Sequence, residues 1–321
     1  MPEGDTVRRT ADRLHLALAG RELVRTELRW PGLGEVDLSG REVLEVKTYG
    51  KHIITRIGAG DGSARFPTAP EVPLTLRSHL RMEGSWRIHA TGPQAWPGRD
   101  QAAVRAVLAG TEWTAVGIWL GLLDLLPTTE EHTLFDHLGP DVLAADFLDP
   151  ATDFGITEAL RRLRAGGGRT IGEALLDQTN LAGIGTFYMA ETLFLKGVSP
   201  WVPVEEVTDL AAMVTLASRM LTANLVRPMP TTTGISRPGQ EQWVHARSGK
   251  PCRRCGTVVR VAMVGPPLRE RTAFYCPSCQ QGPTPTDDGA PMRPLGTSPR
   301  GLPGTGVSAQ GRGGRPAYRR P

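Results

Sequence analysis

The spacing of apolar residues near the N-terminus is that of a helix. Apolar residues recur there every three or four positions, which predicts a helix over residues 5–19 with one buried face. That face carries Val7, Ala11, Leu14 and Leu18. Asp5 is the expected N-cap of the helix, and Gly20 is the expected stop signal after it.

The pattern changes twice further along the chain. From residue 22 to about residue 120, short apolar runs are separated by glycine and proline, which is typical of antiparallel β-strands. Beyond Pro127 the helical spacing returns, with prolines between the segments. The predicted helices cover residues 156–163, 171–178, 187–195 and 207–225. These patterns predict an α+β multidomain protein. Its parts are a β domain (1–125), a linker (126–150), a helical domain (151–244), a cysteine module (245–281) and a tail (282–321).

Composition narrows the class of protein. The 321 residues are 40% hydrophobic and 22% charged, and no run of 18 uncharged apolar residues occurs, so we expect no membrane span. The first residues include acids and lack an apolar segment, which argues against a secretory signal. We therefore expect a cytoplasmic protein whose four cysteines stay reduced.

The net charge of +4 resides in the tail. Residues 282–321 hold six arginines and two aspartates, which sum to +4, so residues 1–281 are formally neutral. The tail also holds nine glycines and eight prolines, which predicts a disordered basic extension. It is either a solubilising segment or a weak electrostatic aid in holding a polyanion. A DNA-binding argument for the folded part must therefore depend on local clusters.

All four cysteines lie in one segment, as two C-x-x-C pairs with 20 residues between them. The pairs are Cys252 with Cys255 and Cys276 with Cys279. Four thiolates at this spacing are a strong zinc signature, because Zn²⁺ prefers tetrahedral sulfur ligands. Two disulfides are the alternative. Between the pairs, residues 257–263 and 272–275 predict a two-stranded hairpin that depends on the metal for folding.

The cysteine module is also strongly basic. Between residues 245 and 281, Glu270 is the only acid. The basic residues are Arg247, Lys250, Arg253, Arg254, Arg260, Arg269 and Arg271. This is the local cluster that the neutral body otherwise lacks, and it predicts either a DNA-contacting surface or a structural hairpin with solvated arginines.

The N-terminus offers a nucleophile. Initiator methionine is normally removed before a small residue, which leaves Pro2 with a free secondary amine. Attack of this amine on a sugar C1′ gives an iminium ion, an electron sink for elimination. The positive end of the following helix disfavours an ammonium ion there, and Glu3 is an adjacent acid or base. Simple helix initiation by Pro-Glu is the alternative.

Six motifs in a fixed order resemble the formamidopyrimidine-DNA glycosylase/endonuclease VIII family of base-excision repair enzymes, on the endonuclease VIII side. The resemblance runs from residue 1 to about residue 281. The motifs are Met1-Pro-Glu-Gly-Asp-Thr6, Tyr49-Gly-Lys51, Ser78-His-Leu-Arg-Met82, Gly139-Pro-Asp141, Asp177-Gln-Thr-Asn-Leu-Ala-Gly-Ile-Gly-Thr186 and the four cysteines. The resemblance implies an N-terminal antiparallel β-sandwich with an N-terminal helix, a helix–two-turn–helix in the helical domain, and a C-terminal zinc hairpin.

The resemblance also implies a reaction. Pro2 would displace the damaged base at C1′, Glu3 would assist ring opening and proton transfer, and Lys51 would contact phosphate beside the lesion. The product would be a strand nicked by β,δ-elimination, with one structural zinc ion and no redox cofactor. The expected partner is damaged double-stranded DNA, bound by a monomer without an obligate protein partner.

DNA contacts follow from the same resemblance. Arg81 and Met82 would fill the gap that an extruded base leaves, because an apolar, flexible side chain can enter the stack. Within the 177–186 motif, glycines would present backbone N–H groups to phosphate at a helix start. The implied DNA-binding residues there and in the hairpin are Asn180, Gly185, Thr186 and Arg271.

Three departures from the family pattern concern the substrate. Thr186 stands where asparagine is usual, and Thr6 where many relatives have glutamate, although Asp5 is adjacent and a candidate substitute. Residues 116–126 lack the Asp-Pro-Arg-Arg-Phe-Gly wedge, which argues against specialisation for 8-oxoguanine paired with cytosine. We therefore expect a glycosylase/AP lyase for oxidised pyrimidines. The alternatives are a non-catalytic damaged-DNA binder, an AP lyase with little base excision, and a generic zinc-ribbon factor.

Overall fold

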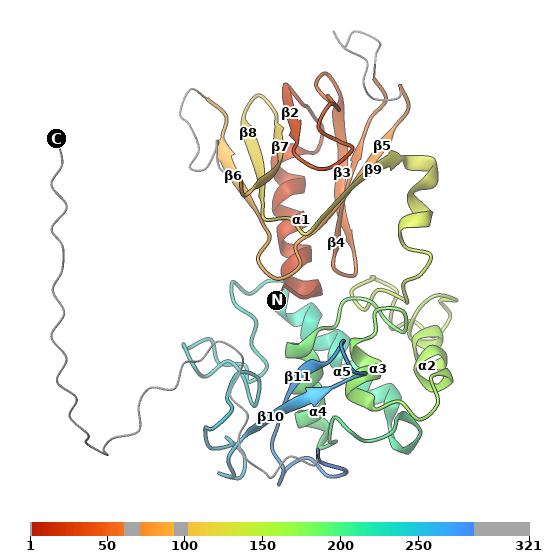
Figure 1. The fold of residues 1–321 in the computed structure, drawn as a ribbon, viewed down its shortest axis with the longest axis vertical. Helices are drawn as coiled ribbons and strands as arrows, with labels where there is room; N and C mark the ends of the chain where they lie inside the picture. Colours follow the sequence, from red (N-terminus) through yellow and green to blue (C-terminus); the bar gives the residue numbers. More distant parts are fainter. Residues whose placement is uncertain (1, 61–70, 93–101, 286–321) are drawn as a thin grey trace, which may run out of the picture.

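A computed structural model describes residues 2–60, 71–92 and 102–285 of the chain (Figure 1). The predicted tail therefore lies outside the described residues from residue 286 onward. Within these three ranges, no helix combines the length and the apolar character that crossing a bilayer requires.

Helix α1 (Gly4–Leu18) begins one residue earlier than the sequence predicts. Its predicted apolar face is buried, and Gly20 follows the helix with a φ of +70°, a conformation that favours glycine. The prediction of Asp5 as N-cap is wrong. Glu3 holds that position, and Asp5 lies inside the first turn with its side chain buried.

Two antiparallel sheets and α1 enclose the first hydrophobic core, as the α+β prediction requires (Figure 1). The five-stranded sheet runs in the order β1-β3-β4-β5-β9, and the four-stranded sheet in the order β2-β7-β8-β6. The first consists of β1 (Arg21–Glu22), β3 (Glu42–Tyr49), β4 (His52–Ile57), β5 (Leu74–His79) and β9 (Leu122–Pro127). The second consists of β2 (Arg25–Leu28), β7 (Val104–Ala109), β8 (Trp113–Ile118) and β6 (Ser85–Ala90).

A second core lies among the helices of the other half, and the N-terminal end of α1 points toward that half (Figure 1). Its elements are α2 (Ile156–Ala165), α3 (Ile171–Leu176), α4 (Thr186–Lys196), η2 (Val204–Glu206) and α5 (Leu210–Asn224). The hairpin of β10 (Arg260–Val264) and β11 (Arg271–Tyr275) packs on α4 through a third apolar cluster that includes Phe194 and Phe274. The hairpin therefore shares a core with α4, although the sequence predicts a unit dependent on metal alone.

The segment between the two halves is packed against both of them. It continues from β9 through η1 (Thr128–Leu134) to buried residues such as Val142 and Phe147. Asp141, itself buried, accepts hydrogen bonds from the amides of Gly50 (2.9 Å) and Leu143 (3.0 Å). The side chain of Asp141 thus fixes the turn between β3 and β4. The exact domain boundaries at 125, 150, 244 and 281 stay predictions.

Replacing Asp141 with alanine should destabilise the protein. The Asp141→Ala change leaves two buried amides without acceptors, so we expect a loss of about 2–4 kcal/mol in the free energy of unfolding. Urea denaturation measures this loss. The exposed Asp153→Ala is the matched control, and equal midpoints for the two variants would contradict the role of Asp141.

Candidate active site and metal centre

The Glu3 carboxylate joins the N-terminal ends of α1 and α4. Glu3 is 3% exposed, and its oxygens accept hydrogen bonds from the amides of Gly185 (2.7 Å), Phe187 (2.7 Å) and Tyr188 (3.3 Å). These are amides that the first turn of α4 leaves without helical partners, and an anion is favoured there. The Gly4 amide adds a hydrogen bond of 3.0 Å to the Gly183 carbonyl. Pro2, half-buried, therefore lies directly beside this junction.

The same turn holds Lys51 from the other side. Lys51 follows Gly50 at the end of the β3–β4 hairpin, and its Nζ donates to the Ile184 carbonyl at 2.5 Å. Gly50 has a φ of +56°, and a Cβ there would lie 2.8 Å from the Cβ of Ala182, so the close approach requires glycine. A lysine that would otherwise be expected on the surface is thus buried.

Burial and charge shift the proton affinities of this pair in opposite directions. Burial raises the pKa of Glu3, although the positive charge of Lys51 and the three amides oppose this shift. Burial lowers the pKa of Lys51, the Glu3 charge opposes the shift, and Arg271 adds to it. The two shifts bring the proton affinities of the two groups closer together.

A cleft of about 390 Å³ opens beside this junction. The structure brings four predicted residues to its wall: Lys51, Gly185, Thr186 and Arg271. Arg271 begins β11, is exposed, and forms no ion pair with any described residue. Arg169, in contrast, forms salt bridges with Glu173 (2.8 Å) and Asp177 (2.9 Å). The free positive charge in the cleft favours an anion such as phosphate.

The structure adds His79 to the cleft, a residue to which the sequence assigned no role. Burial first, and then the charges of Lys51, Arg81 and Arg77, lower the pKa of His79 to about 4. Its Nδ1 accepts a hydrogen bond from the Arg81 amide at 2.9 Å, so the neutral ring carries its proton on Nε2. His79 is therefore a neutral donor. The sequence feature that could have indicated a role for His79 is its place in the Ser78–Met82 motif.

Arg81 and Met82 lie on a separate turn between β5 and β6. Met82 is 62% exposed, which removes the alternative of a core methionine. Arg81 has a φ of +51°, an uncommon conformation for a residue with a side chain. Their roles in DNA binding stay predictions.

Two predicted contacts point inward instead. Asn180 is 6% exposed, and its Nδ2 donates to the Ala174 carbonyl at 3.0 Å, so its amide is used within the turn. The Gly185 amide, one of the backbone N–H groups of the turn, donates to Glu3. A carboxylate from the start of the chain thus pairs this amide, and the role of Gly185 in DNA binding stays a prediction.

A second cavity, called here the inner cavity, is lined by Glu3 itself. Its volume is about 270 Å³. The wall consists of Glu3, Asp5, Thr6, Phe187, Tyr188, Pro230, Gln242, His245 and Ala246. Residues of α1 and α4 both line the inner cavity, and the start of α4, at Gly185 and Thr186, also lines the cleft.

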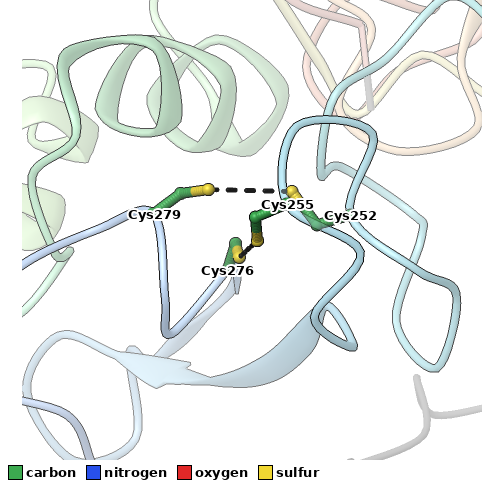
Figure 2. Close-up of side chains that lie close together, drawn as sticks. All are labelled: Cys252, Cys255, Cys276 and Cys279. Carbon is green, nitrogen blue, oxygen red and sulfur yellow. Dashed lines mark hydrogen bonds between the residues drawn. The ribbon is translucent and has the colours of Figure 1, made fainter.

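The four cysteines form one cluster, as the sequence predicts (Figure 2). Their Sγ atoms all lie within 4.8 Å of one another, with Cys252–Cys279 at 3.9 Å and Cys255–Cys276 at 3.5 Å. Sulfurs around a tetrahedral zinc ion with Zn–S distances of about 2.3 Å lie about 3.8 Å apart. The four thiols therefore fit zinc, and none of them forms a disulfide.

Glu191 holds the backbone that leads from the inner cavity toward the cysteine cluster. This fully buried carboxylate in the middle of α4 accepts hydrogen bonds from the amides of Trp243 (2.8 Å), Val244 (2.9 Å) and His245 (2.8 Å). These residues precede the first cysteine and lead out of the cavity wall. Helix α4 thus holds the start of the segment that leads to Cys252.

Known proteins of similar sequence decide the family. Residues 1–117 match the model of the formamidopyrimidine-DNA glycosylase N-terminal domain. "Probable endonuclease 8 2" of Streptomyces coelicolor is 48% identical over 291 residues, which cover 90% of this chain and 97% of that protein. The chain belongs to the formamidopyrimidine-DNA glycosylase/endonuclease VIII family. The resemblance stated from the motifs, including its endonuclease VIII side, is confirmed.

Further family members agree with this assignment. "DNA-(apurinic or apyrimidinic site) lyase Nei2" of Mycolicibacterium smegmatis is 39% identical, covering 87% of this chain and 99% of that protein. A Lactococcus lactis family member (Fpg), solved in complex with DNA containing an abasic site, superposes with a TM-score of 0.66 at 22% identity. The superposition covers 88% of this chain and all of that chain, and confirms the fold.

A methyl group at position 185 should disturb the junction. A Cβ on Gly185 would lie 2.5 Å from Glu3 Oε1, so Gly185→Ala must displace the buried carboxylate. We expect a loss of about 1–3 kcal/mol in the free energy of unfolding, measured by urea denaturation. Gly34→Ala, where nothing lies within 4 Å, is the control, and a Gly185→Ala variant as stable as this control would contradict the packing.

Proposed function

We propose that this protein is a DNA glycosylase with AP lyase activity in base-excision repair. The observation that carries the proposal is the junction of α1 and α4. There Pro2, whose nitrogen becomes a free amine once Met1 is removed, directly precedes the buried Glu3 carboxyl group, and a cleft lined by Lys51 and Arg271 lies nearby. The family assignment and the endonuclease 8 and lyase names of the relatives support the same activity.

The proposed chemistry begins with the Pro2 amine. Its nitrogen attacks C1′ of the damaged nucleotide, the bond to the base breaks, and ring opening leaves an iminium ion. Glu3 passes the proton from the Pro2 nitrogen to the sugar oxygen, a role that its raised pKa favours. The iminium ion then acidifies the C2′ proton, and elimination of the phosphates nicks the strand.

Phosphate binding follows from the lining of the cleft. Arg271 supplies a guanidinium without an acidic partner among described residues, His79 supplies a neutral N–H donor, and Thr186 supplies a hydroxyl. Lys51, anchored on Ile184, sets the positive potential at the reacting end. These groups would hold the backbone of damaged double-stranded DNA while the base is extruded.

The substrate and the state of the protein are part of the proposal. Oxidised pyrimidines are the proposed bases, because the chain lacks the Asp-Pro-Arg-Arg-Phe-Gly wedge and its similar relatives carry endonuclease 8 names. Exposed Met82 would enter the gap in the stack, together with Arg81. We propose a monomer in the cytoplasm, without an obligate protein partner.

The cysteine cluster is proposed to hold one structural zinc ion. Its four thiols supply a closed tetrahedral site, and a closed site leaves no open position for chemistry. The metal would fix the hairpin that presents Arg271 to the cleft.

A second candidate is an AP lyase with little base excision. The name of the Mycolicibacterium smegmatis relative, a DNA-(apurinic or apyrimidinic site) lyase, favours it. Parallel assays on duplexes with thymine glycol and with a preformed abasic site separate the two functions, because this candidate nicks only the second duplex.

The first test is covalent trapping at the N-terminus. Borohydride and abasic-site DNA should yield an adduct on the Pro2 nitrogen, because borohydride reduces the iminium ion to a stable amine. Peptide mass spectrometry locates the adduct. The same protein with an uncleaved Gly-Ser extension is the control, and an adduct that persists with the extension would refute the assignment.

Metal removal tests the zinc site. The purified protein should contain one zinc ion per chain, and a strong chelator should weaken its binding to abasic-site DNA by disordering the hairpin. Elemental analysis and fluorescence anisotropy measure the two effects, and added zinc should restore binding. Full affinity in metal-free protein would overturn the structural role.

A further inference from the structure

Two connections run side by side at the end of the β half that faces the helices (Figure 1). Residues 80–84 connect β5 to β6, and residues 119–121 connect β8 to β9. The residues that flank the two connections are paired across the strands, His79 with Leu122 and Ser85 with Ile118. Both connections therefore start and end at the same two places in the β half.

Trp119 begins the second connection and is exposed. The residue is 50% exposed and has a φ of +49°, an uncommon conformation for a side chain of this size. Its amide donates to the Ala103 carbonyl at 2.8 Å, which holds the backbone in place. The Arg105 guanidinium lies 5.4 Å from the centre of the indole ring. An exposed aromatic ring on a costly backbone conformation indicates a contact with another molecule.

The two connections lead away from the cleft. His79, at one end of both, lines the cleft, whereas Trp119 follows Ile118 at the other end. Met82, 62% exposed, lies on the first connection between these ends. The proposed function places the damaged strand in the cleft and Met82 in the gap that the extruded base leaves. The side beyond Met82, where Trp119 lies, therefore belongs to the opposite strand.

We infer that Trp119 stacks on the base of the opposite strand that loses its partner when the damaged nucleotide is extruded. This inference rests on the proposed glycosylase function, in which that base is left unpaired. The ligand is a nucleobase of duplex DNA, bound through the face of its ring. Arg105, against the same indole, completes a stack of guanidinium, indole and base.

The chemistry of the second connection makes this contact tolerant of the opposite base. Residues 119–121 are tryptophan, leucine and glycine, so the indole N–H is their only polar side-chain group. Arg81, the cation of the first connection, lies against Gly121, where a Cβ would come within 2.4 Å of the Arg81 Cδ. Discrimination between bases needs a pattern of donors and acceptors, whereas every base offers a ring face for stacking. The four opposite bases should therefore be bound alike.

Trp119→Ala tests the inference by removing the ring. Full-length protein is bound to duplexes with tetrahydrofuran, an abasic-site analogue, opposite each of the four bases, and to the single strand with the same analogue. Fluorescence anisotropy should show an affinity about 10-fold lower for all four duplexes and unchanged for the single strand, which has no opposite base. Trp119→Phe keeps an aromatic ring and should stay within about threefold of the wild type.

Trp113→Ala is the matched control for this measurement. Trp113 is an exposed tryptophan at the opposite end of β8, and its loss should leave binding to all five DNAs unchanged. A fluorescent base reports the stacking itself. With 2-aminopurine opposite the analogue and saturating protein, the wild type should quench the emission more strongly than Trp119→Ala does.

Three outcomes overturn the role of Trp119. They are unchanged duplex binding by Trp119→Ala, an equal loss on the single strand, and a loss confined to one opposite base. The second would place the ring on the damaged strand, and the third would indicate readout by hydrogen bonds. A wild type that nicks no abasic-site duplex overturns the proposed function itself, and with it this inference.

Discussion

The arrangement of the site depends on one carboxylate at one helix end. Glu3 lies 182 residues from Gly185 in the chain, yet its oxygens satisfy three amides of α4 at the start of that helix. The anion and the helix stabilise each other, and burial strengthens their attraction. Because Glu3 follows Pro2 directly, this contact also fixes the position of Pro2. The contact that joins the two halves therefore also positions the proposed nucleophile.

The rest of the junction supports this contact from the β half. Gly50 and Lys51 reach the turn before α4, and Asp141 fixes the backbone of Gly50 from the intervening segment. A motif in the β half, one in the connection and one before α4 are therefore parts of a single hydrogen-bonded unit. The cleft is lined by the β half, by residues 169–186 and by the β10–β11 hairpin. The segment between the halves packs against both of them, which keeps these parts in place.

Features set by local chemistry were predictable from the sequence. The spacing of the cysteines predicted that they form one cluster, and the apolar spacing in α1 predicted which face of that helix is buried. Features set by distant contacts were not predictable. Asp5 was expected as the N-cap because aspartate is a common capping residue at the start of a helix. The N-cap position of α1 is instead held by Glu3, whose side chain caps the other helix, α4. Asn180 and the Gly185 amide turn inward for the same reason, since their partners are defined only in the folded chain.

Glu191 is a second buried carboxylate that holds backbone from a distant part of the chain. The backbone that it holds, from Trp243 to His245, lies at the cavity wall, and the chain continues from there to the first cysteine, Cys252. Oxidation of the exposed Cys255 thiol would remove a ligand and loosen this segment at its far end. The wall of the inner cavity would then lose its support. A DNA repair enzyme of this family would in this way be sensitive to peroxide through its cysteine cluster, although that cluster is not part of the proposed reaction.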